Sequence, residues 1–340
     1  MKKIMLYLFL AAILILAWLG FDVYRKVFSS YQDYSGKVVV RIEPGNSAAS
    51  ISALLYRQGI IANALYFKQY YRWFFRGKTL KAGEYLFEGP LTMRQIIQKL
   101  ILGKAILYKI TFIEGLGIDE MALIFQEAGI FAAREFILAA SNTNLINDLD
   151  PEAADLEGYL FPDTYLVRKD ISATEMVAMM VRRFRENFSN TFIWRAKDID
   201  FTIRQVVIMA SLIEKETAVR DERFLVSSVF HNRLRLKTLL DCDSSIIYAL
   251  KKAGHYSGKL GWDDLKLPSP YNTRLYRGLP PGPIGNPGYA SLEAALYPEN
   301  TDYLYFVAKD DNSHYFSKTL AEHNRVVKKF IIDKKDIGFD

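Results

Sequence analysis

Two glutamates end a strongly apolar segment, and their types and positions suit acid–base chemistry. Residues 203–216 read IRQVVIMASLIEKE, a pattern that is apolar nearly all round a helix and predicts burial. Residues two apart point about 200° away from each other on a helix, so Glu214 and Glu216 cannot form a catalytic pair on one face. A carboxyl at the end of a buried helix loses hydration, which raises its pKa and suits a general acid working near neutral pH. The spacing leaves an alternative open, in which each glutamate forms an ion pair at a solvated helix end with Lys215, Arg220 or Arg223.

Composition argues against several other kinds of chemistry. The 340 residues include four histidines and one cysteine with no metal-ligand spacing, so we expect no metal site, and no cofactor is indicated. A lone Cys242 excludes an intramolecular disulfide and is most simply a small buried residue. The net charge of +6 favours anionic partners, but it is scattered and forms no nucleic-acid-binding motif. We therefore expect no nucleic-acid partner.

The N-terminus carries an uncharged apolar run from Ile4 to Phe21, near the lower length limit for a membrane-spanning helix. No small-x-small cleavage site precedes Asp22, so we expect a retained single-pass anchor within residues 1–28. Residues 22–36 are polar and are predicted to form a stalk. Basic residues flank both ends of the run, so charge alone does not set its orientation. With the N-terminus inside the cell, the rest of the chain lies on the extracytoplasmic side of the membrane.

A pattern occurs twice after the anchor. Alternating apolar residues predict strands that begin near Val38 and Tyr108, and each is followed by a glycine turn and an amphipathic helix. A glycine ends each helix, as a left-handed cap requires, at Gly59 and Gly129. The similarity extends further, to two predicted Tyr-Leu-Phe strands, Tyr85–Phe87 and Tyr159–Phe161, and to a helix after each, the second opening with a capping box. We infer two related β-α-α-β-α units, at about 38–103 and 108–185.

The second half of the chain predicts a different organisation. Residues 202–253 form a helical block, and residues 267–296 form a loop rich in proline and glycine. A loop this long within a compact domain is usually functional. The end of the chain predicts strand, turn, strand and helix. The overall fold class is therefore α+β.

Several stretches, in order, resemble the signature of the endolytic murein transglycosylases, the MltG/YceG-like family. The resemblance covers essentially the whole chain, including the N-terminal anchor, and rests on these stretches: KAGEYLF (81–87), LEGYLFPDTY (156–165), ASLIEKETAV with ERFLVSSVFHNRL (210–234), SPYNTR (269–274), GLPPGPIGNPG (278–288) and HYFSKTLAEHN (314–324). It implies a small LysM-like module at 37–103 and a catalytic domain at 104–340. The module would bind glycan or, alternatively, serve as a packing platform.

The resemblance implies an activity and a catalytic residue. Family members cleave the β-1,4 bond between N-acetylmuramic acid and N-acetylglucosamine in peptidoglycan and leave 1,6-anhydro-N-acetylmuramic acid ends. The second glutamate of the family's Glu-Lys-Glu-Thr motif is catalytic, which falls on Glu216, with Glu214 in support. One carboxyl suffices because the sugar's own 6-hydroxyl is the nucleophile, so Glu216 would act first as acid and then as base. The same resemblance implies termination of nascent strands and penicillin-binding proteins as partners.

Other residues are candidates for substrate contact. Asn272 offers hydrogen bonds to N-acetyl or hydroxyl groups, although asparagine in loops is usually a turn former. Glu157 lines the substrate site or braces it, and so does Asp163. Tyr271, like Tyr159, stacks on a sugar or belongs to the core, and loop 278–288 is a rigid turn or, as the resemblance favours, a wall of the site.

One position departs from the family pattern. Asp241 in LDCDSS stands where the family usually has glutamine, and its carboxylate could change substrate contacts or the pKa of Glu216. Two rivals to the lytic reaction remain. One is a non-catalytic wall-binding or scaffold protein, and the other is a hydrolase that uses water, with Asp163 or Asp243 as the base.

Overall fold

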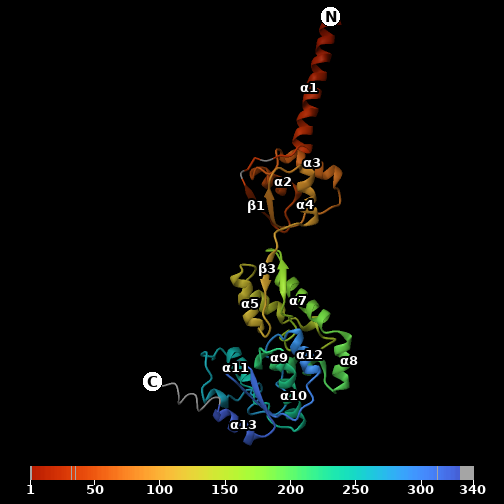
Figure 1. Cartoon of the computed structure of the whole chain (residues 1–340). Coiled ribbons are helices and arrows are strands. Elements are labelled where there is room, and N and C mark those ends of the chain that lie inside the picture. The colour runs from red at the N-terminus through yellow and green to blue at the C-terminus, as the bar shows by residue number, and fades with distance from the viewer. Residues whose placement is uncertain (1, 32, 35, 312, 330–340) are drawn as a thin grey trace. The chain divides into compact units, whose positions relative to one another are not determined.

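The computed structural model describes residues 2–31, 33, 34, 36–311 and 313–329. Two residues of the predicted stalk, Gln32 and Ser35, and residues 330–340 of the predicted catalytic domain lie outside the described residues. The chain divides into two compact units, one comprising residues 1–109 with 165–171 and the other residues 110–164 with 172–340. Figure 1 labels the elements of both units.

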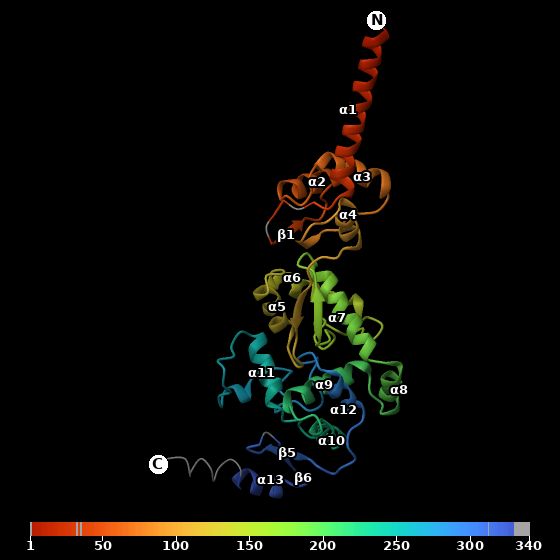
Figure 2. The same ribbon diagram turned by 45° about the horizontal axis from the view of Figure 1, so that its top comes forward.

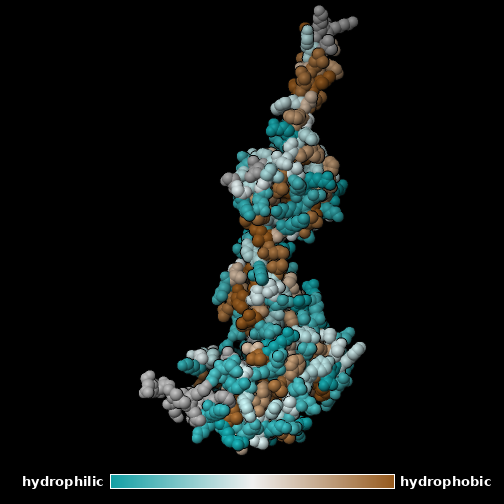
Figure 3. All heavy atoms as spheres, viewed as in Figure 1, coloured by the Kyte–Doolittle hydropathy of each residue, from teal (hydrophilic) through white to brown (hydrophobic). Residues whose placement is uncertain are grey.

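Helix α1 (Lys2–Phe28) contains a segment, Tyr7–Phe28, that is long and apolar enough to span a membrane. Its apolar side chains form a brown column in Figure 3. The helix does not end where the polar residues begin, so the predicted stalk is wrong over residues 22–28. The reason is packing: Val27 is only 5% exposed and belongs to the core of the following module, and Lys26 pairs with Asp22 one turn earlier at 2.8 Å. Anchor helix and module therefore share one compact unit.

The module after α1 is built from β1 (Lys37–Ile42), α2 (Ala48–Arg57), α3 (Ala64–Phe74), β2 (Gly83–Glu88) and α4 (Met93–Leu102). The two strands pair antiparallel, with Val40 opposite Tyr85. Alternate strand residues are buried together with one face of each helix, which gives the module its own core. Gly59, at the end of α2, has a φ of 69°, the predicted left-handed conformation.

The second copy has the same order: β3 (Tyr108–Thr111), α5 (Ile118–Glu127), α6 (Ala133–Ala140), β4 (Thr164–Val167) and α7 (Ala173–Asn187), with a short 3₁₀ turn, η1 (Thr143–Leu145), after α6. Strands β3 and β4 form a two-stranded sheet. Gly129 has a φ of 64°, and Ser172 forms the predicted capping box at α7. The predicted β-α-α-β-α repeat is confirmed.

One strand of the repeat was placed too early. Residues 159–161 form a turn and not a strand, and β4 begins at Thr164. Gly158 explains the change, because it has a φ of 87° and a Cβ there would lie 2.6 Å from side-chain atoms of both Val207 and Pro283. The chain therefore makes a tight left-handed turn at this point, which the apolar pattern alone did not indicate.

The remaining elements include one buried helix, α9, with α8, α10, α11 and α12 packed against it. They are α8 (Asn190–Asp198), α9 (Ile203–Glu216), α10 (Glu222–Arg235), α11 (Asp243–Lys252), η2 (Asp264–Lys266), α12 (Tyr289–Leu296), β5 (Tyr305–Ala308), β6 (His314–Ser317) and α13 (Leu320–Val327). Helix α9 is buried without a break from Val206 to Ile213, as predicted, and packs against α10 and α12. The predicted loop ends earlier than expected, since its last eight residues form α12. Figure 2 shows the terminal hairpin β5–β6 beside α13.

Candidate active site

The two glutamates of α9 lie at its C-terminal end and reach different partners. The helix begins with a capping box formed by Thr202 and Gln205 and ends at Glu216, because Thr217 adopts an extended backbone. Glu214 and Glu216 hydrogen-bond to different segments of the chain, as their helical spacing predicts. Each therefore has its own electrostatic environment.

Glu214 is held in a buried ion pair. Its carboxylate accepts a hydrogen bond from Arg223 on α10 at 2.8 Å and one from the backbone N–H of Gly288 at 2.9 Å. The side chains of Glu214 and Arg223 are only 5% and 8% exposed, and Arg223 also contacts Glu114 at 3.3 Å. Glu214 therefore forms the ion pair that the sequence left open as an alternative. The helix end where it does so is buried, however, and not solvated as that alternative assumed. Its position joins α9, α10 and the loop that leads into α12.

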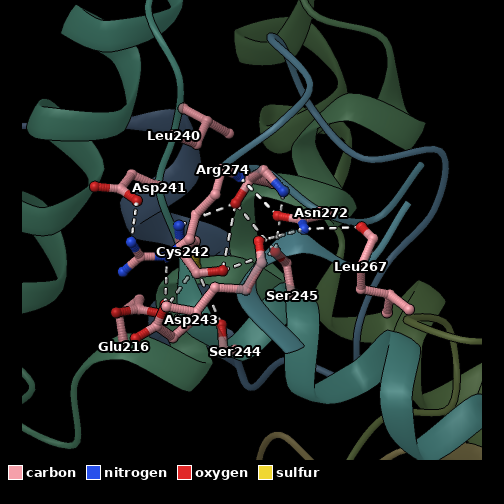
Figure 4. A network of polar contacts seen from close by, with 12 residues as sticks. Glu216, Leu240, Asp241, Cys242, Asp243, Ser244, Ser245, Leu267, Asn272 and Arg274 are labelled. Carbon is pink, nitrogen blue, oxygen red and sulfur yellow. Dashed lines mark hydrogen bonds and ion pairs between the residues drawn. The ribbon is translucent and has the colours of Figure 1, made fainter. Parts of the chain in front are cut away.

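Glu216 has a different set of neighbours. The thiol of Cys242 donates to its Oε1 at 2.8 Å, and the hydroxyl of Ser244 donates to the same oxygen at 2.9 Å. Burial raises the pKa of Glu216 above its ordinary value, the two donors oppose that rise, Asp243 adds to it and His314 opposes it. Figure 4 shows the carboxyl beside the start of α11, where both donors lie.

The turn that carries the two donors is fixed by the SPYNTR stretch. Backbone N–H groups of Asp241 and Cys242 donate to the carbonyl and the hydroxyl of Thr273, at 3.1 and 2.9 Å. Arg274 pairs with Asp241 at 3.2 Å and with Asp243 at 2.8 Å. The turn is thus held on both sides before α11 begins, which sets where Cys242 and Ser244 point.

Asn272 braces the loop from inside, and its predicted contact with substrate does not fit this position. The side chain is fully buried, donates to the carbonyls of Leu265 and Leu267 at 3.0 and 2.9 Å, and accepts from the backbone N–H of Arg274 at 3.0 Å. Asn272 therefore acts as a turn former, the alternative that the sequence left open. Its bonds to the loop backbone use both amide hydrogens and the carbonyl oxygen.

Asp241 sits at the exposed edge of this turn. Its backbone has a φ of 55°, in the left-handed region, and its side chain is 46% exposed and paired with Arg274. The neighbouring carboxylate that raises the pKa of Glu216 is that of Asp243. The structure thus ties Asp241 to the shape of the turn.

A cavity of about 340 Å³ opens beside the donors. Ser244 and Lys215 line it near Glu216, and further walls come from α5, from α6, from α11 with Tyr248 and Lys251, and from the loop that carries Glu157. Its size lies at the lower end of the range typical of ligand sites. Ile284 also lines it, so part of loop 278–288 is a wall of this cavity.

Glu157 is buried at the cavity wall in a network of its own. It accepts hydrogen bonds from the backbone N–H of Ile118 at 3.2 Å, from the amide of Asn286 at 2.9 Å and from the hydroxyl of Tyr248 at 3.4 Å. Burial raises its pKa to about 8, so the carboxyl is largely protonated at neutral pH. Glu157 both lines and braces the site, because it links the start of α5 to loop 278–288.

The other aromatic and acidic candidates divide between site and core. Tyr271 is partly buried, with its ring 5.1 Å from that of Tyr248, a residue of the cavity wall. Tyr159 is fully buried and donates to Asp150 at 2.8 Å, which makes it a core residue. Asp163 pairs with Arg183 at 2.7 Å.

Sequence reasoning missed four members of these networks. The sequence indicates only a packing role for Cys242 and none for Ser244, Asn286 or His314. The side-chain oxygen of Asn286 accepts a hydrogen bond from the backbone N–H of Leu160 at 2.9 Å. The ring Nδ1 of His314 is hydrogen-bonded to the carboxylate of Glu222 at 2.6 Å. Two signals for these contacts were available in the sequence, the asparagine within the glycine- and proline-rich loop and the histidine that opens HYFSKT. Polar side chains that become buried usually form hydrogen bonds.

Known proteins resemble this chain along most of its length. The model of the YceG-like family matches residues 40–329. An endolytic murein transglycosylase of Bacillus subtilis (strain 168) is 33% identical over 321 residues, 90% of this chain and 88% of that protein. One of Streptococcus pneumoniae is 27% identical over 328 residues, 87% of this chain and 59% of that protein. A solved structure of a YceG-like protein of Listeria monocytogenes is 34% identical, with a TM-score of 0.59, and the match covers 86% of this chain and 99% of that one. The extent of the family match and the identity to the Bacillus protein show that this chain belongs to the YceG-like family.

Proposed function

We propose that this protein is a membrane-anchored lytic transglycosylase that cuts peptidoglycan glycan strands internally, with Glu216 as its catalytic acid and base. The names of the curated relatives support the reaction class. The single observation that carries the assignment to Glu216 is its carboxyl at the end of the buried helix α9, with Oε1 held by two donors from α11.

The environment of Glu216 supports both roles. Burial raises the pKa of Glu216, which favours the protonated carboxyl that can donate to a glycosidic oxygen. The Cys242 and Ser244 donors both bind Oε1, which leaves Oε2 to carry the proton that is given to the substrate. The same donors stabilise the carboxylate that remains after proton transfer.

The reaction proceeds in two proton transfers. Glu216 donates its proton to the oxygen that links C1 of N-acetylmuramic acid to N-acetylglucosamine, and the C1–O bond breaks. The 6-hydroxyl of the same N-acetylmuramic acid bonds to C1 while Glu216 takes up the hydroxyl proton. The 1,6-anhydro ring forms, Glu216 regains its proton and no water is consumed.

The cavity beside Ser244 is proposed to hold the sugar next to the cleaved bond. The protonated Glu157 at its wall offers a donor or acceptor to a hydroxyl or N-acetyl group, and Tyr271 with Tyr248 offers an aromatic surface. Asp241 and Glu214 support the site from its edges, through Arg274 and Arg223. Asn272 contributes by holding the loop and not by touching the sugar.

The apolar helix α1 supports a membrane location for this activity. We propose that α1 anchors the protein in the bacterial inner membrane with the catalytic part outside the cytoplasm, and that module 37–103 is LysM-like and binds glycan. Cleavage close to the membrane would end the elongation of nascent strands, and penicillin-binding proteins are the proposed partners.

The test is a digest of purified peptidoglycan and of nascent uncrosslinked strands by the full-length protein, with Glu216→Gln in parallel. Products are weighed by mass spectrometry, because hydrolysis adds water and anhydro formation does not. Anhydro-ended fragments from the wild type alone are expected. Reducing-ended fragments would show a hydrolase, and glycan binding without cleavage would show a scaffold protein.

A further inference from the structure

The membrane-proximal module carries an uninterrupted stretch of one charge sign. Residues 44–83 contain six lysines or arginines and no aspartate or glutamate. Four of the basic residues lie on α3 and the turn after it, and all four are exposed: Lys68, Arg72, Arg76 and Lys78. Within the described part of the chain, none of the four is in an ion pair with an acidic side chain.

The same helix exposes large apolar side chains. Phe67 and Tyr70 are buried in the module core, whereas Leu65 on the opposite face of α3 is 60% exposed and Trp73, beside the buried face, is 72% exposed. Phe74, the last residue of α3, is 65% exposed. A helix with basic and large apolar residues on its open face is typical of segments that lie in a membrane interface.

An aromatic contact series joins this helix to the anchor. The ring of Tyr24 stacks on Phe28 at 5.6 Å, Phe28 meets Tyr70 at 5.8 Å, and Tyr70 meets Phe74 at 4.7 Å. Lys26 lies over the ring of Tyr66 at 5.7 Å. Figures 1 and 2 both show α3 at the end of the module that α1 enters. Helix α3 is therefore fixed to the last turn of α1.

The length of α1 sets the depth of this contact. The uncharged run ends at Phe21, and Phe28 follows seven residues later, about 10 Å along a helix. The polar layer on each side of a bilayer is roughly 5–8 Å thick. Tyr70, which adjoins Phe28, and Phe74, which adjoins Tyr70, thus lie at the outer edge of the headgroup layer when the apolar run fills the hydrocarbon.

We propose that α3 and the turn after it, residues 64–78, form a second membrane contact that lies on the bilayer surface. Trp73 and Phe74 enter the interface, where aromatic side chains are favoured. Lys68, Arg72, Arg76 and Lys78 face the phosphates of anionic lipid headgroups. The contact holds the module against the membrane instead of leaving it free on a tether. It rests on the anchor proposed above.

The first test places the full-length protein in nanodiscs whose lipids carry bromine near the glycerol end of the acyl chains, which quenches nearby tryptophan. One variant keeps Trp73 and replaces Trp18, Trp194 and Trp262, all exposed, by phenylalanine. We expect bromolipid to quench Trp73 and nanodiscs to reduce its quenching by aqueous acrylamide. Full acrylamide access without bromolipid quenching would overturn the proposal.

A second variant keeps only Trp18, in the middle of α1, and reports on the anchor itself. Quenching of Trp18 without quenching of Trp73 refutes the surface contact and leaves the anchor in place. An unquenched Trp18 refutes both. The glycan digest tests the active site independently of either result.

Charge removal tests the lipid chemistry. The four basic residues of this segment are replaced by glutamine. In anionic nanodiscs the ratio of molecules with residues 64–78 on the lipid surface to those without this contact should fall by about fivefold for each charge removed, with little change in neutral nanodiscs. The matched control is Arg94→Gln with Lys104→Gln, exposed basic residues of the same compact unit outside α3. Equal loss in the control variant, or docking in neutral discs at the same strength, would contradict the role of anionic headgroups. Docking that requires an added protein would replace lipid with a protein partner.

Discussion

Removal of the Ser244 hydroxyl should move the alkaline limb of the activity profile to higher pH. A general acid loses activity as pH rises through its pKa, so this limb reports the protonation of Glu216 in the substrate complex. Ser244 donates to the carboxyl at 2.9 Å and favours the carboxylate form. Its loss in Ser244→Ala therefore favours the protonated form and raises the pKa.

The size of this pKa shift follows from the difference between a hydrogen bond to the carboxylate of Glu216 and one to its protonated carboxyl. A hydrogen bond to a charged group contributes about 1.5–3 kcal/mol and one between neutral groups about 0.5–1.5 kcal/mol. The hydroxyl then favours the carboxylate by roughly 1–1.5 kcal/mol, which corresponds to about one pH unit. Part of that stabilisation is present in the transition state, so the plateau of kcat should fall by about fivefold. Cys242→Ala should show a smaller shift in the same direction, because a thiol is the weaker donor.

The assay is anhydro-product formation from defined glycan strands between pH 5 and pH 9, measured as kcat. Cys242→Ser is the matched control, because it keeps a donor and should leave the limb close to that of the wild type. Asp243 and His314 also influence the carboxyl and are unchanged in every variant. An alkaline limb that stays in place or moves to lower pH in Ser244→Ala would refute the role of the donors.

Three further changes have expected outcomes. Asp243→Asn removes the charge that raises the pKa of Glu216, so the alkaline limb should move to lower pH, whereas Asp241→Asn should leave it in place. Arg223→Leu leaves the buried Glu214 carboxylate without its ion pair and should lower the free energy of unfolding in denaturant by about 3–5 kcal/mol. Glu157 has a folded pKa of about 8, above its unfolded value, so wild-type stability should fall from about pH 4.5 to pH 8, on the order of a few kcal/mol, and Glu157→Gln should flatten that fall.

Each of these has a control or a contradicting result. Arg183→Leu breaks an ion pair whose arginine is 46% exposed and should cost under about 1 kcal/mol, so equal losses in both arginine variants would refute the importance of burial. If Asp243→Asn and Asp241→Asn shifted the alkaline limb of the activity profile equally, the effect would come from the overall charge and not from the interaction between Asp243 and Glu216. Parallel stability profiles of wild type and Glu157→Gln would show that Glu157 does not hold its proton in the folded state.

Local signals predicted much of the fold, because the repeat depends on contacts close in sequence. Gly59 and Gly129 end their helices in the left-handed conformation, and alternation placed β1 and β3. The same reasoning failed at residues 159–161, where an apolar triplet follows Gly158. The backbone of that glycine is fixed by Val207 and Pro283, residues far away in the sequence, and no local pattern carries that information.

The stalk was mispredicted for a related reason. Residues 22–28 are polar on average, which favours an exposed linker, but Val27 finds the core of the module and the helix continues. Polarity describes most of the surface of this segment, while one buried side chain decides its structure. The tertiary contact overrides the average composition.

The sequence singles out Glu216 as the candidate catalytic residue, but it does not indicate the groups that set the pKa of its carboxyl. Its two donors lie 26 and 28 residues further along the chain, and their positions depend on Thr273 and Arg274 in another loop. A residue that has to donate a proton and take one back needs opposing influences on its pKa. Burial by itself would give a carboxyl that keeps its proton, and the donors by themselves would give a carboxylate that never holds one. The role proposed for Glu216 therefore requires both the apolar helix α9 and the polar turn before α11, and only the first of these is visible in the sequence.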